Sequence, residues 1–196
     1  ETNTPPHNLG DVIDGGLAMM DNPAITTDGL FQIIPGPDFP TAPLILGQSG
    51  ARAAYNTGRG SIIQRCRHKI EEKRGDRQSI VLTSMPYQVG KSNLVEKIAE
   101  AAKDKRIEGI SDIRDESNRE GVRVVIDLKR DATPEVVLNQ LWRNTPAQSN
   151  FAANMLAIRG GRPEVLGLRD FLSTFIGFRE EVITRRTKFE LNKARD

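Results

Sequence analysis

The chain has 196 residues, of which 37% are hydrophobic and 28% are charged, and its formal net charge is +2. This composition excludes a disordered chain, and the sequence has no apolar run of about 18 residues that would predict a transmembrane helix. Because the total charge is small, binding to a polyanion has to come from local clusters of cations. The single cysteine, Cys66, excludes an intrachain disulfide and fits a reducing cytoplasm, so we expect a cytoplasmic protein without a membrane partner.

We expect the sequence to be a piece of a longer protein. It begins without methionine, and no signal-peptide pattern precedes the first predicted element. Its last residues still have the pattern of a continuing helix.

Two short helices are predicted ahead of a rigid connector. Apolar residues recur at helical spacing from Leu9 to about Met20, and Asn8 is placed to cap this helix. A second short helix is expected to end near Ile34. Residues 35–43, P-G-P-D-F-P-T-A-P, then predict a turn-rich connector and a domain boundary.

Strands and helices alternate after this connector. Strands are expected at residues 44–46, 61–70, 79–84, 107–113 and 122–128, and helices at residues 49–55, 89–105 and 134–143. Residues 71–78 are expected to form the charged turn of a hairpin, and residues 151–166 a second hairpin around Gly160 and Gly161. The pattern predicts an α+β fold, with a small mixed or antiparallel sheet and packed helices.

A long helix is predicted from Leu168 to Asp196. Its apolar stripe gives way to charged residues after Ile183, as in a helix that leaves a core and enters a coiled coil. The expected organisation is a helical connector in residues 1–34, an α+β domain in residues 35–166 and the start of a coiled-coil arm in residues 167–196.

Gly90-Lys91-Ser92 follows a predicted strand and opens a predicted helix, which is the setting of a phosphate-binding loop. The full motif needs a glycine five residues before Gly90, where the sequence has Met85. Pro86 also lacks one of the backbone N–H groups that cradle phosphate. An ordinary turn at the start of a helix is therefore the favoured interpretation.

Three acids, Asp112, Asp115 and Glu116, offer oxygen ligands for a hard cation. Arg114 and Arg119 are interleaved with them, however, and the spacing is not that of an EF-hand. A salt-bridged loop is favoured, and no metal site is predicted.

Other reactive side chains have no partners at catalytic spacing. His7 and His68 lack a cysteine or an acid at ligand or triad spacing. Cys66 lies between Arg65 and Arg67, which could lower the pKa of its thiol, but a packing thiol within a strand is favoured.

A basic stretch runs from Arg59 to Arg77, with seven cations, three acids and a local net charge of +4. If this segment forms one strand, Arg65, Arg67 and Lys69 share a face, with about 7 Å between neighbours. Such a row can follow the phosphate backbone of DNA, and a solvated sheet face explains it equally well. The predicted DNA-binding residues are Arg59, Arg65, Arg67 and Lys69.

Six segments resemble the A subunits of bacterial type IIA DNA topoisomerases. They are T-N-T-P-P-H-N-L-G-D-V-I-D-G (residues 2–15), G-P-D-F-P-T (36–41), Y-N-T-G-R-G-S-I (55–62), P-Y-Q-V-G-K-S-N-L-V-E-K-I-A-E (86–100), I-E-G-I-S-D-I-R-D-E-S-N-R-E-G-V-R-V-V-I-D-L-K-R-D-A (107–132) and E-V-I-T-R-R-T-K-F-E-L (181–191). The resemblance extends over essentially the whole chain. P-Y-Q-V and I-E-G-I-S-D-I-R-D-E-S are closer to the DNA gyrase form than to the topoisomerase IV form.

In that family a tyrosine in an Arg-Tyr-Thr context attacks a DNA phosphodiester, and a second duplex passes through the break. The resemblance implies that the full enzyme is an isomerase that supercoils DNA with hydrolysis of ATP. It also implies that this segment is the tower domain and the start of the coiled-coil arm, which support the gate duplex. The implied partners are double-stranded DNA, the gyrase B subunit and a second A subunit in an A2B2 heterotetramer. The B subunit binds Mg²⁺ and ATP, so no cofactor is expected in this segment.

Neither tyrosine has the sequence context of the family's nucleophile. Tyr55 follows alanine and Tyr87 follows proline, so no catalytic residue is predicted and the segment alone is expected to be inactive. Two interpretations stay open: a DNA-binding scaffold, and a structural spacer between the nucleophile domain and the dimerising arm without useful DNA affinity. No motif supports an independent enzyme.

Overall fold

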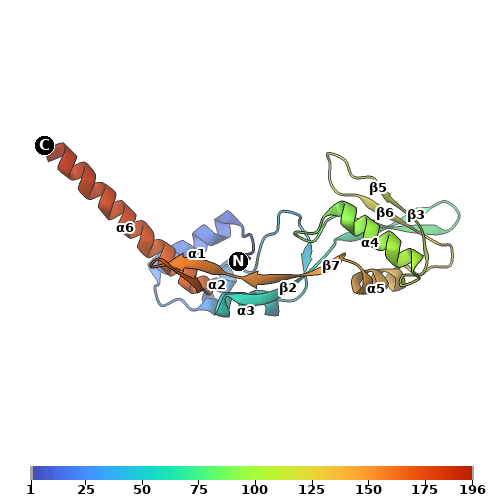
Figure 1. Cartoon of the computed structure of the whole chain (residues 1–196), viewed down its shortest axis with the longest axis horizontal. Helices are drawn as coiled ribbons and strands as arrows, with labels where there is room; N and C mark the ends of the chain where they lie inside the picture. Colours follow the sequence, from blue (N-terminus) through green and yellow to red (C-terminus); the bar gives the residue numbers. More distant parts are fainter. Residues whose placement is uncertain (1, 196) are drawn as a thin grey trace. The chain divides into compact units, whose positions relative to one another are not determined.

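The computed structural model describes residues 2–195 and has an α+β fold, as predicted (Figure 1). The helices are α1 (Leu9–Asp21), α2 (Thr27–Ile33), α3 (Ser49–Thr57), α4 (Lys91–Lys103), α5 (Pro134–Asn144) and α6 (Leu168–Arg195). The strands are β1 (Leu44–Ile45), β2 (Arg59–Arg65), β3 (His68–Lys73), β4 (Arg77–Leu82), β5 (Ile110–Asp115), β6 (Val124–Leu128), β7 (Gln148–Asn154), β8 (Leu156–Arg159) and β9 (Arg162–Val165). None of these helices is long and apolar enough to cross a membrane.

The chain forms two compact units. Within the described range, the first comprises residues 2–38, 48–61 and 152–195, and the second comprises residues 39–47 and 62–151. The chain first contributes residues 39–47 to the second unit, then enters this unit again within β2 and returns to the first within β7.

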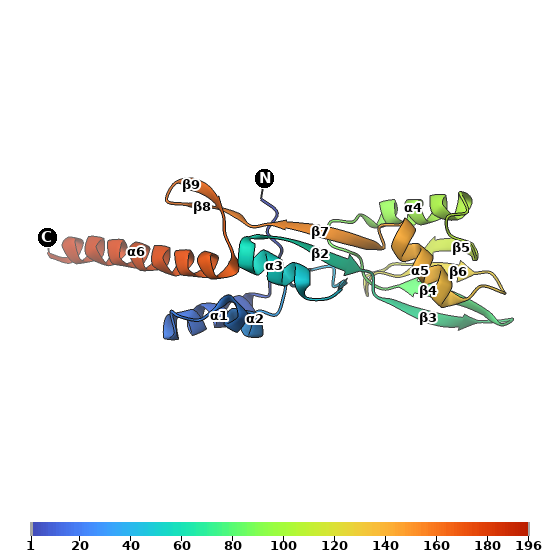
Figure 2. The ribbon, with the colours of Figure 1, turned by 90° about the horizontal axis from the view of Figure 1, so that it is seen from below.

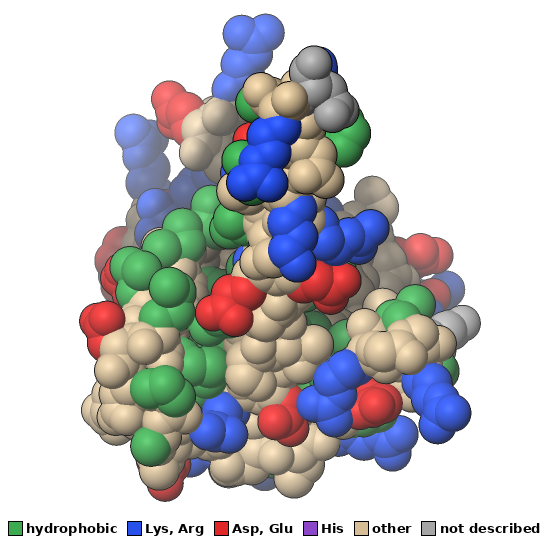
Figure 3. Space-filling model, turned by 90° about the vertical axis from the view of Figure 1, so that its left-hand side faces the viewer, with side chains coloured by type: hydrophobic (Ala, Val, Ile, Leu, Met, Phe, Trp, Pro, Cys, Tyr) green, Lys and Arg blue, Asp and Glu red, His purple; other side chains and the backbone are tan. Residues whose placement is uncertain are grey.

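The first unit contains α1, α2, α3, α6 and the β8–β9 hairpin. Asn8 caps α1 as predicted, because its side-chain oxygen accepts a hydrogen bond from the N–H of Asp11 at 3.2 Å. Leu30, Ile34 and Leu172 are buried where α2 and the first turns of α6 meet their neighbours. The long C-terminal helix is confirmed, and exposed basic side chains lie along its later turns (Figure 3).

Gly58 fixes the point at which the chain leaves α3 and enters β2. Its φ is +79°, a left-handed conformation that favours glycine at the end of a helix. A Cβ atom here would lie 2.5 Å from Cγ1 of Val165 and 2.8 Å from the carbonyl oxygen of Leu166. Arg59 follows Gly58 directly and is the first residue of β2.

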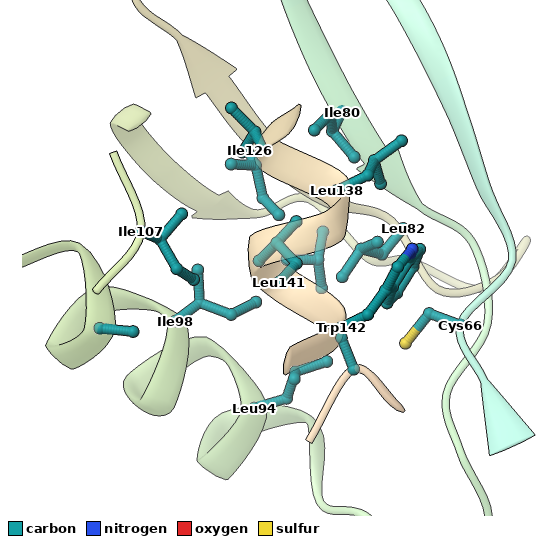
Figure 4. Close-up of a cluster of buried hydrophobic side chains, with 14 of the residues drawn as sticks. Cys66, Ile80, Leu82, Leu94, Ile98, Ile107, Ile126, Leu138, Leu141 and Trp142 are labelled. Carbon is teal, nitrogen blue, oxygen red and sulfur yellow. The ribbon is translucent and has the colours of Figure 1, made fainter. Parts of the chain in front are cut away.

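The second unit is built on a four-stranded antiparallel sheet in the order β3-β4-β6-β5. Helices α4 and α5 pack on one face of this sheet (Figures 2 and 4). Because successive side chains of a strand point to opposite faces, the β-branched residues of β4 and β6 supply this face at every second position. The core side chains include Ile80, Leu82, Val124, Ile126 and Leu128 from the sheet, Leu94 and Ile98 from α4, and Leu138, Leu141 and Trp142 from α5.

Cys66 belongs to the same core cluster (Figure 4). It is fully buried, and burial raises the pKa of its thiol to about 12. The prediction of a packing thiol is therefore confirmed, whereas its predicted place in the middle of a strand is wrong.

The prediction of one long strand over residues 61–70 is also wrong. Strand β2 belongs to a three-stranded sheet with β1 and β7 and ends at Arg65. The chain then joins the four-stranded sheet at His68, the first residue of β3. At the break the N–H of Cys66 donates to the carbonyl oxygen of Ala147, and the N–H of Arg67 donates to the hydroxyl of Ser84. These two bonds supply backbone partners where neither sheet does, so the segment can change sheets.

Candidate nucleic-acid interface

The face of the four-stranded sheet that lies opposite α4 and α5, here called the ion-paired face, carries most of the charges of the second unit's strands. The register pairs Lys69 with Val81 and Ser79 with Asp127, which places these side chains on the side away from the core. Val81 is nevertheless fully buried. Burial of an apolar residue on this face implies that the stems of the flanking long side chains cover it.

One line of ion pairs on this face is centred on Glu71. Two guanidinium N–H groups of Arg123 donate to the two carboxylate oxygens of Glu71 at 2.7 and 2.8 Å. The ammonium of Lys69 lies 3.1 Å from the same carboxylate, and Arg123 also reaches Glu116 at 3.5 Å. Hydrogen bonds from Arg123 and then Lys69 lower the pKa of Glu71 from 4.5 to about 2. The charge of Lys69 is therefore neutralised within the chain.

A second line is centred on Asp127, whose side chain is 17% exposed. Lys73 and Arg114 both form ion pairs with this carboxylate, and the hydroxyl of Ser79 donates to it at 2.6 Å. Burial opposes ionisation of Asp127, but the hydrogen bonds from Arg114, Lys73 and Ser79 outweigh it and lower the pKa. Arg114 also contacts Asp112, which faces Asp127 across the β5–β6 ladder.

The predicted residues Arg65 and Arg67 lie on either side of the break between β2 and β3. Arg65 is half-buried, donates twice to the side-chain oxygen of Gln148 at 3.0 and 2.6 Å, and lies over the ring of Trp142 at 4.8 Å. Arg67 is exposed, and its Nε–H donates to the carbonyl oxygen of Ala42 at 3.0 Å. Both guanidinium groups keep further N–H donors, because each has five.

The structure does not bring the four predicted cations into one row. Arg65, Arg67 and Lys69 belong to the second unit, but the break after Arg65 removes the strand geometry that would have aligned them. Arg59 lies in the first unit, is exposed, and its side chain has no ion pair with any described acid. The assignment of these residues to DNA binding stays a prediction.

Three arginines outside the predicted DNA-binding set line one hollow at the β3–β4 turn. Arg74 and Arg77 flank the turn, and together with Gly75 and Arg130 they line one surface hollow. None of the three arginines forms an ion pair with an acid among residues 2–195. The basic stretch identified two of them, whereas Arg130 comes from the loop between β6 and α5.

The acidic residues that precede β6, Asp112, Asp115 and Glu116, do not form one cluster of carboxylates. Asp112 lies on the ion-paired face beside Arg114, whereas Asp115 forms an ion pair at 2.9 Å with Lys91 at the start of α4. Hydrogen bonds from Ser117 and then Lys91 lower the pKa of Asp115 to about 2. In the described part of the chain, no group of three or more His, Cys, Asp and Glu side chains is arranged to hold a metal ion.

The same ion pair bears on the Gly90-Lys91-Ser92 segment. Lys91 is engaged by Asp115, and the backbone N–H of Tyr87 donates to the side chain of Gln64 at 2.7 Å. Gly90 itself has a φ of −72°, which any residue adopts. These contacts favour the interpretation as a turn that opens α4.

Comparison with known proteins bears on the whole chain. The family model for the A subunit of DNA gyrase/topoisomerase IV matches residues 1–196. The chain belongs to this family.

Several DNA gyrase A subunits are similar to the chain over its full length. The identity is 63% over 195 residues with the protein of Granulibacter bethesdensis, 57% over 199 residues with that of Synechocystis, and 55% over 197 residues with that of Pseudomonas aeruginosa. Each alignment covers 100% of this chain and 21–23% of the relative, so the chain spans about a fifth of the length of these proteins. The resemblance to DNA gyrase A subunits is confirmed.

The two tyrosines of this gyrase-family chain are packing residues. Tyr55 is 1% exposed, its hydroxyl lies 2.7 Å from Nε2 of His7, and burial raises its pKa. Since Nδ1 of His7 lies 2.7 Å from the carbonyl oxygen of Pro5, which can only accept, His7 donates there and Tyr55 donates to Nε2. Tyr87 is half-buried and forms an aromatic cluster with Phe39 and Phe151, whose ring centroids lie 5.3 and 6.0 Å from its own.

Proposed function

We propose that this chain is a duplex-supporting segment of a bacterial type II DNA topoisomerase A subunit of the gyrase form. The observation that carries the proposal is the match of the gyrase/topoisomerase IV A-subunit family over residues 1–196. Residues 1–34 act as a helical connector, residues 35–166 as the tower domain and residues 167–196 as the start of a coiled-coil arm. The segment holds double-stranded DNA through its phosphates and does not read bases.

The proposal places the segment in a larger cytoplasmic assembly. The complete enzyme is an isomerase that changes DNA topology by ATP-dependent passage of one duplex through another. Its partners are the gyrase B subunit and a second A subunit in an A2B2 heterotetramer. Mg²⁺ and ATP bind to the B subunit, and this segment contributes no catalytic residue.

The environment of the tyrosines supports the lack of a nucleophile in this segment. Tyr55 is buried with its hydroxyl committed to His7, so its phenol is not presented to a phosphodiester. Tyr87 packs against Phe39 and Phe151 and lacks the Arg-Tyr-Thr context of the family's nucleophile. We expect no covalent protein–DNA adduct when the purified chain is incubated with supercoiled DNA, Mg²⁺ and ATP; an adduct on denaturing gels would contradict the proposal.

A DNA-binding scaffold and a structural spacer differ in duplex affinity. The scaffold is favoured by exposed cations that no described acid neutralises, among them Arg59 and Arg67. Titration of the chain into a fluorescent duplex of about 30 base pairs at low salt separates the two, because non-specific DNA binding has a Kd of about 10⁻⁴–10⁻⁶ M even at physiological salt. A Kd weaker than about 10⁻⁴ M at low salt favours the spacer.

The predicted phosphate contacts of Arg65 and Arg67 are tested by the salt dependence of binding. Each lost contact lowers the slope of log affinity against log salt by about 0.9, so the double Arg65→Ala/Arg67→Ala variant is expected to lose up to about 1.8. Arg65→Ala also removes packing on Trp142, so the folding of the variant is checked by thermal unfolding. An unchanged slope in a folded variant places the DNA contact elsewhere.

A further inference from the structure

The hollow at the β3–β4 turn combines three features that a binding site for phosphate oxygens needs. It is lined by three arginines, Arg74, Arg77 and Arg130, together with Gly75. They come from two separate segments, because Arg130 follows β6 and the other two flank the turn. All three residues are exposed, so their donors are accessible from solvent.

We infer that Arg74, Arg77 and Arg130 form a phosphate-binding site that takes a backbone phosphodiester of duplex DNA. This inference rests on the proposed function and names the site at which that function acts. It moves the principal contact away from Lys69 on the ion-paired face to the end of the β3–β4 hairpin.

The contrast with the neighbouring lysines supports the assignment. Lys69 and Lys73 lie on the same hairpin, and each is engaged by a carboxylate of the chain, Glu71 and Asp127 respectively. The acids nearest to the hollow in sequence are Glu72, Asp76 and Asp131, and none of them forms an ion pair with its arginines. Glu72 accepts a hydrogen bond from Gln78 at 2.8 Å, and Asp76 forms no ion pair with any described cation.

The turn itself is built to hold two of these arginines near each other. Lys73 pairs with Arg77 in the β3–β4 ladder, so Arg74 begins a three-residue loop and Arg77 closes it. Gly75 and Asp76 have φ values of +76° and +56°, and this left-handed pair makes the tight reversal possible. Arg74 and Arg77 also line a second hollow, whose charged residues include Lys73 but also Glu72 and Asp127. The hollow that includes Arg130 is the one whose charged lining residues are all cations.

Arginine is the suitable side chain for this ligand. A guanidinium group is planar, stays charged at any physiological pH and presents paired N–H donors that match two phosphate oxygens. Three such groups around one hollow bind a diester through its charge and oxygen geometry, without contacts that distinguish bases. The ligand class is therefore a nucleic-acid phosphate of any sequence.

Binding of a fluorescent duplex of about 30 base pairs to the 196-residue chain tests the site. The variants are Arg77→Gln and Arg130→Gln, and the matched control is Arg119→Gln, an exposed arginine without an ion pair that lies outside the hollow. We expect each hollow variant to lower the salt slope by about 0.9 and to weaken binding about eight-fold at 0.1 M salt, as for one lost phosphate contact. Asp76→Asn, which removes the acid of the turn, is expected to strengthen binding.

The outcomes separate this inference from the proposed function. If the wild-type chain binds and both hollow variants behave like Arg119→Gln, the arginine site is wrong and duplex binding stands. If the wild-type chain itself does not bind the duplex, the proposed function fails and the site fails with it. Thermal unfolding of each variant checks the fold, and competition by inorganic phosphate at millimolar concentration reports separately on the hollow as an anion site.

Discussion

The two faces of the four-stranded sheet achieve stability in opposite ways. The face toward α4 and α5 is apolar, with Ile80, Leu82 and Ile126 fully buried. The ion-paired face carries alternating charges that neutralise one another across strands, centred on Glu71 and Asp127. The difference teaches that a high density of cations in a sequence is no measure of the charge that a surface offers to DNA.

The largest expected effect is the loss of stability when a residue of the apolar face, and not of the ion-paired face, is substituted. Leu82→Ala removes a fully buried side chain and is expected to lower the free energy of unfolding by about 3 kcal/mol, through lost burial and the cavity left behind. Lys69→Gln on the opposite face is the matched control, with an expected change of less than about 0.5 kcal/mol. Urea denaturation measures both. Equal effects would show that the ion pairs stabilise the sheet as much as its core does.

An intermediate loss of stability is expected when Asp127, the centre of the second line of ion pairs, is substituted. Asp127→Asn removes a carboxylate that Lys73, Arg114 and Ser79 all contact, and is expected to cost about 2 kcal/mol, as for hydrogen bonds to a charged group. Asp112→Asn changes the same charge at a more exposed position, where the expected loss is small. The urea midpoints of the two variants should differ clearly; coincident midpoints would contradict the central place given to Asp127.

Acid titration is expected to lower the stability of the fold through its ion-paired carboxylates, Glu71 on the ion-paired face and Asp115 beside α4. A carboxylate whose pKa is lower in the folded chain stabilises the fold above its unfolded pKa, and this contribution is lost as the pH falls through the folded pKa. For Glu71 these values are 4.5 and about 2, and for Asp115 they are 3.8 and about 2. Unfolding free energy should therefore decline between about pH 4.5 and 2, with a shallower decline in Glu71→Gln. A decline of the same steepness in that variant would assign the acid sensitivity to other groups.

The smallest expected effect concerns DNA binding by the paired lysine. Because Glu71 already neutralises Lys69, Lys69→Gln should lower the salt slope of duplex binding by much less than the about 0.9 of a full phosphate contact. Glu71→Gln releases Lys69 and Arg123 and should strengthen binding. Fluorescence anisotropy over a salt series measures both changes. A decrease of about 0.9 in the slope for Lys69→Gln would instead support the prediction that Lys69 contacts phosphate as part of a row of cations.

The elements with local signals could be predicted from the sequence. The periodic apolar positions of α4, α5 and α6, the cap at Asn8 and the β-branched run of β6 depend on neighbouring residues. The break after Arg65 could not be predicted, because its backbone partners are Ala147 and Ser84, which only the folded chain brings near.

The same limit applies to the candidate site. Counting charges between Arg59 and Arg77 identified the basic segment that contains β3 and the β3–β4 turn, although residues 71–73, predicted to lie in the turn, belong to β3. It could not tell which cations are neutralised, because the partners lie far along the chain: Glu71 meets Arg123 and Lys73 meets Asp127. Nor could spacing bring Arg130 to the β3–β4 turn, since that depends on the order of strands in the sheet.

We propose that this chain binds duplex DNA through phosphates and does not read bases. The most direct test is the affinity of the chain for two duplexes of equal length and unrelated sequence, measured from low to physiological salt. We expect a straight log–log plot whose slope is about −2 or steeper and is the same for both duplexes, from two or more phosphate contacts. No binding at low salt, or a slope and affinity that depend on the sequence, would contradict it.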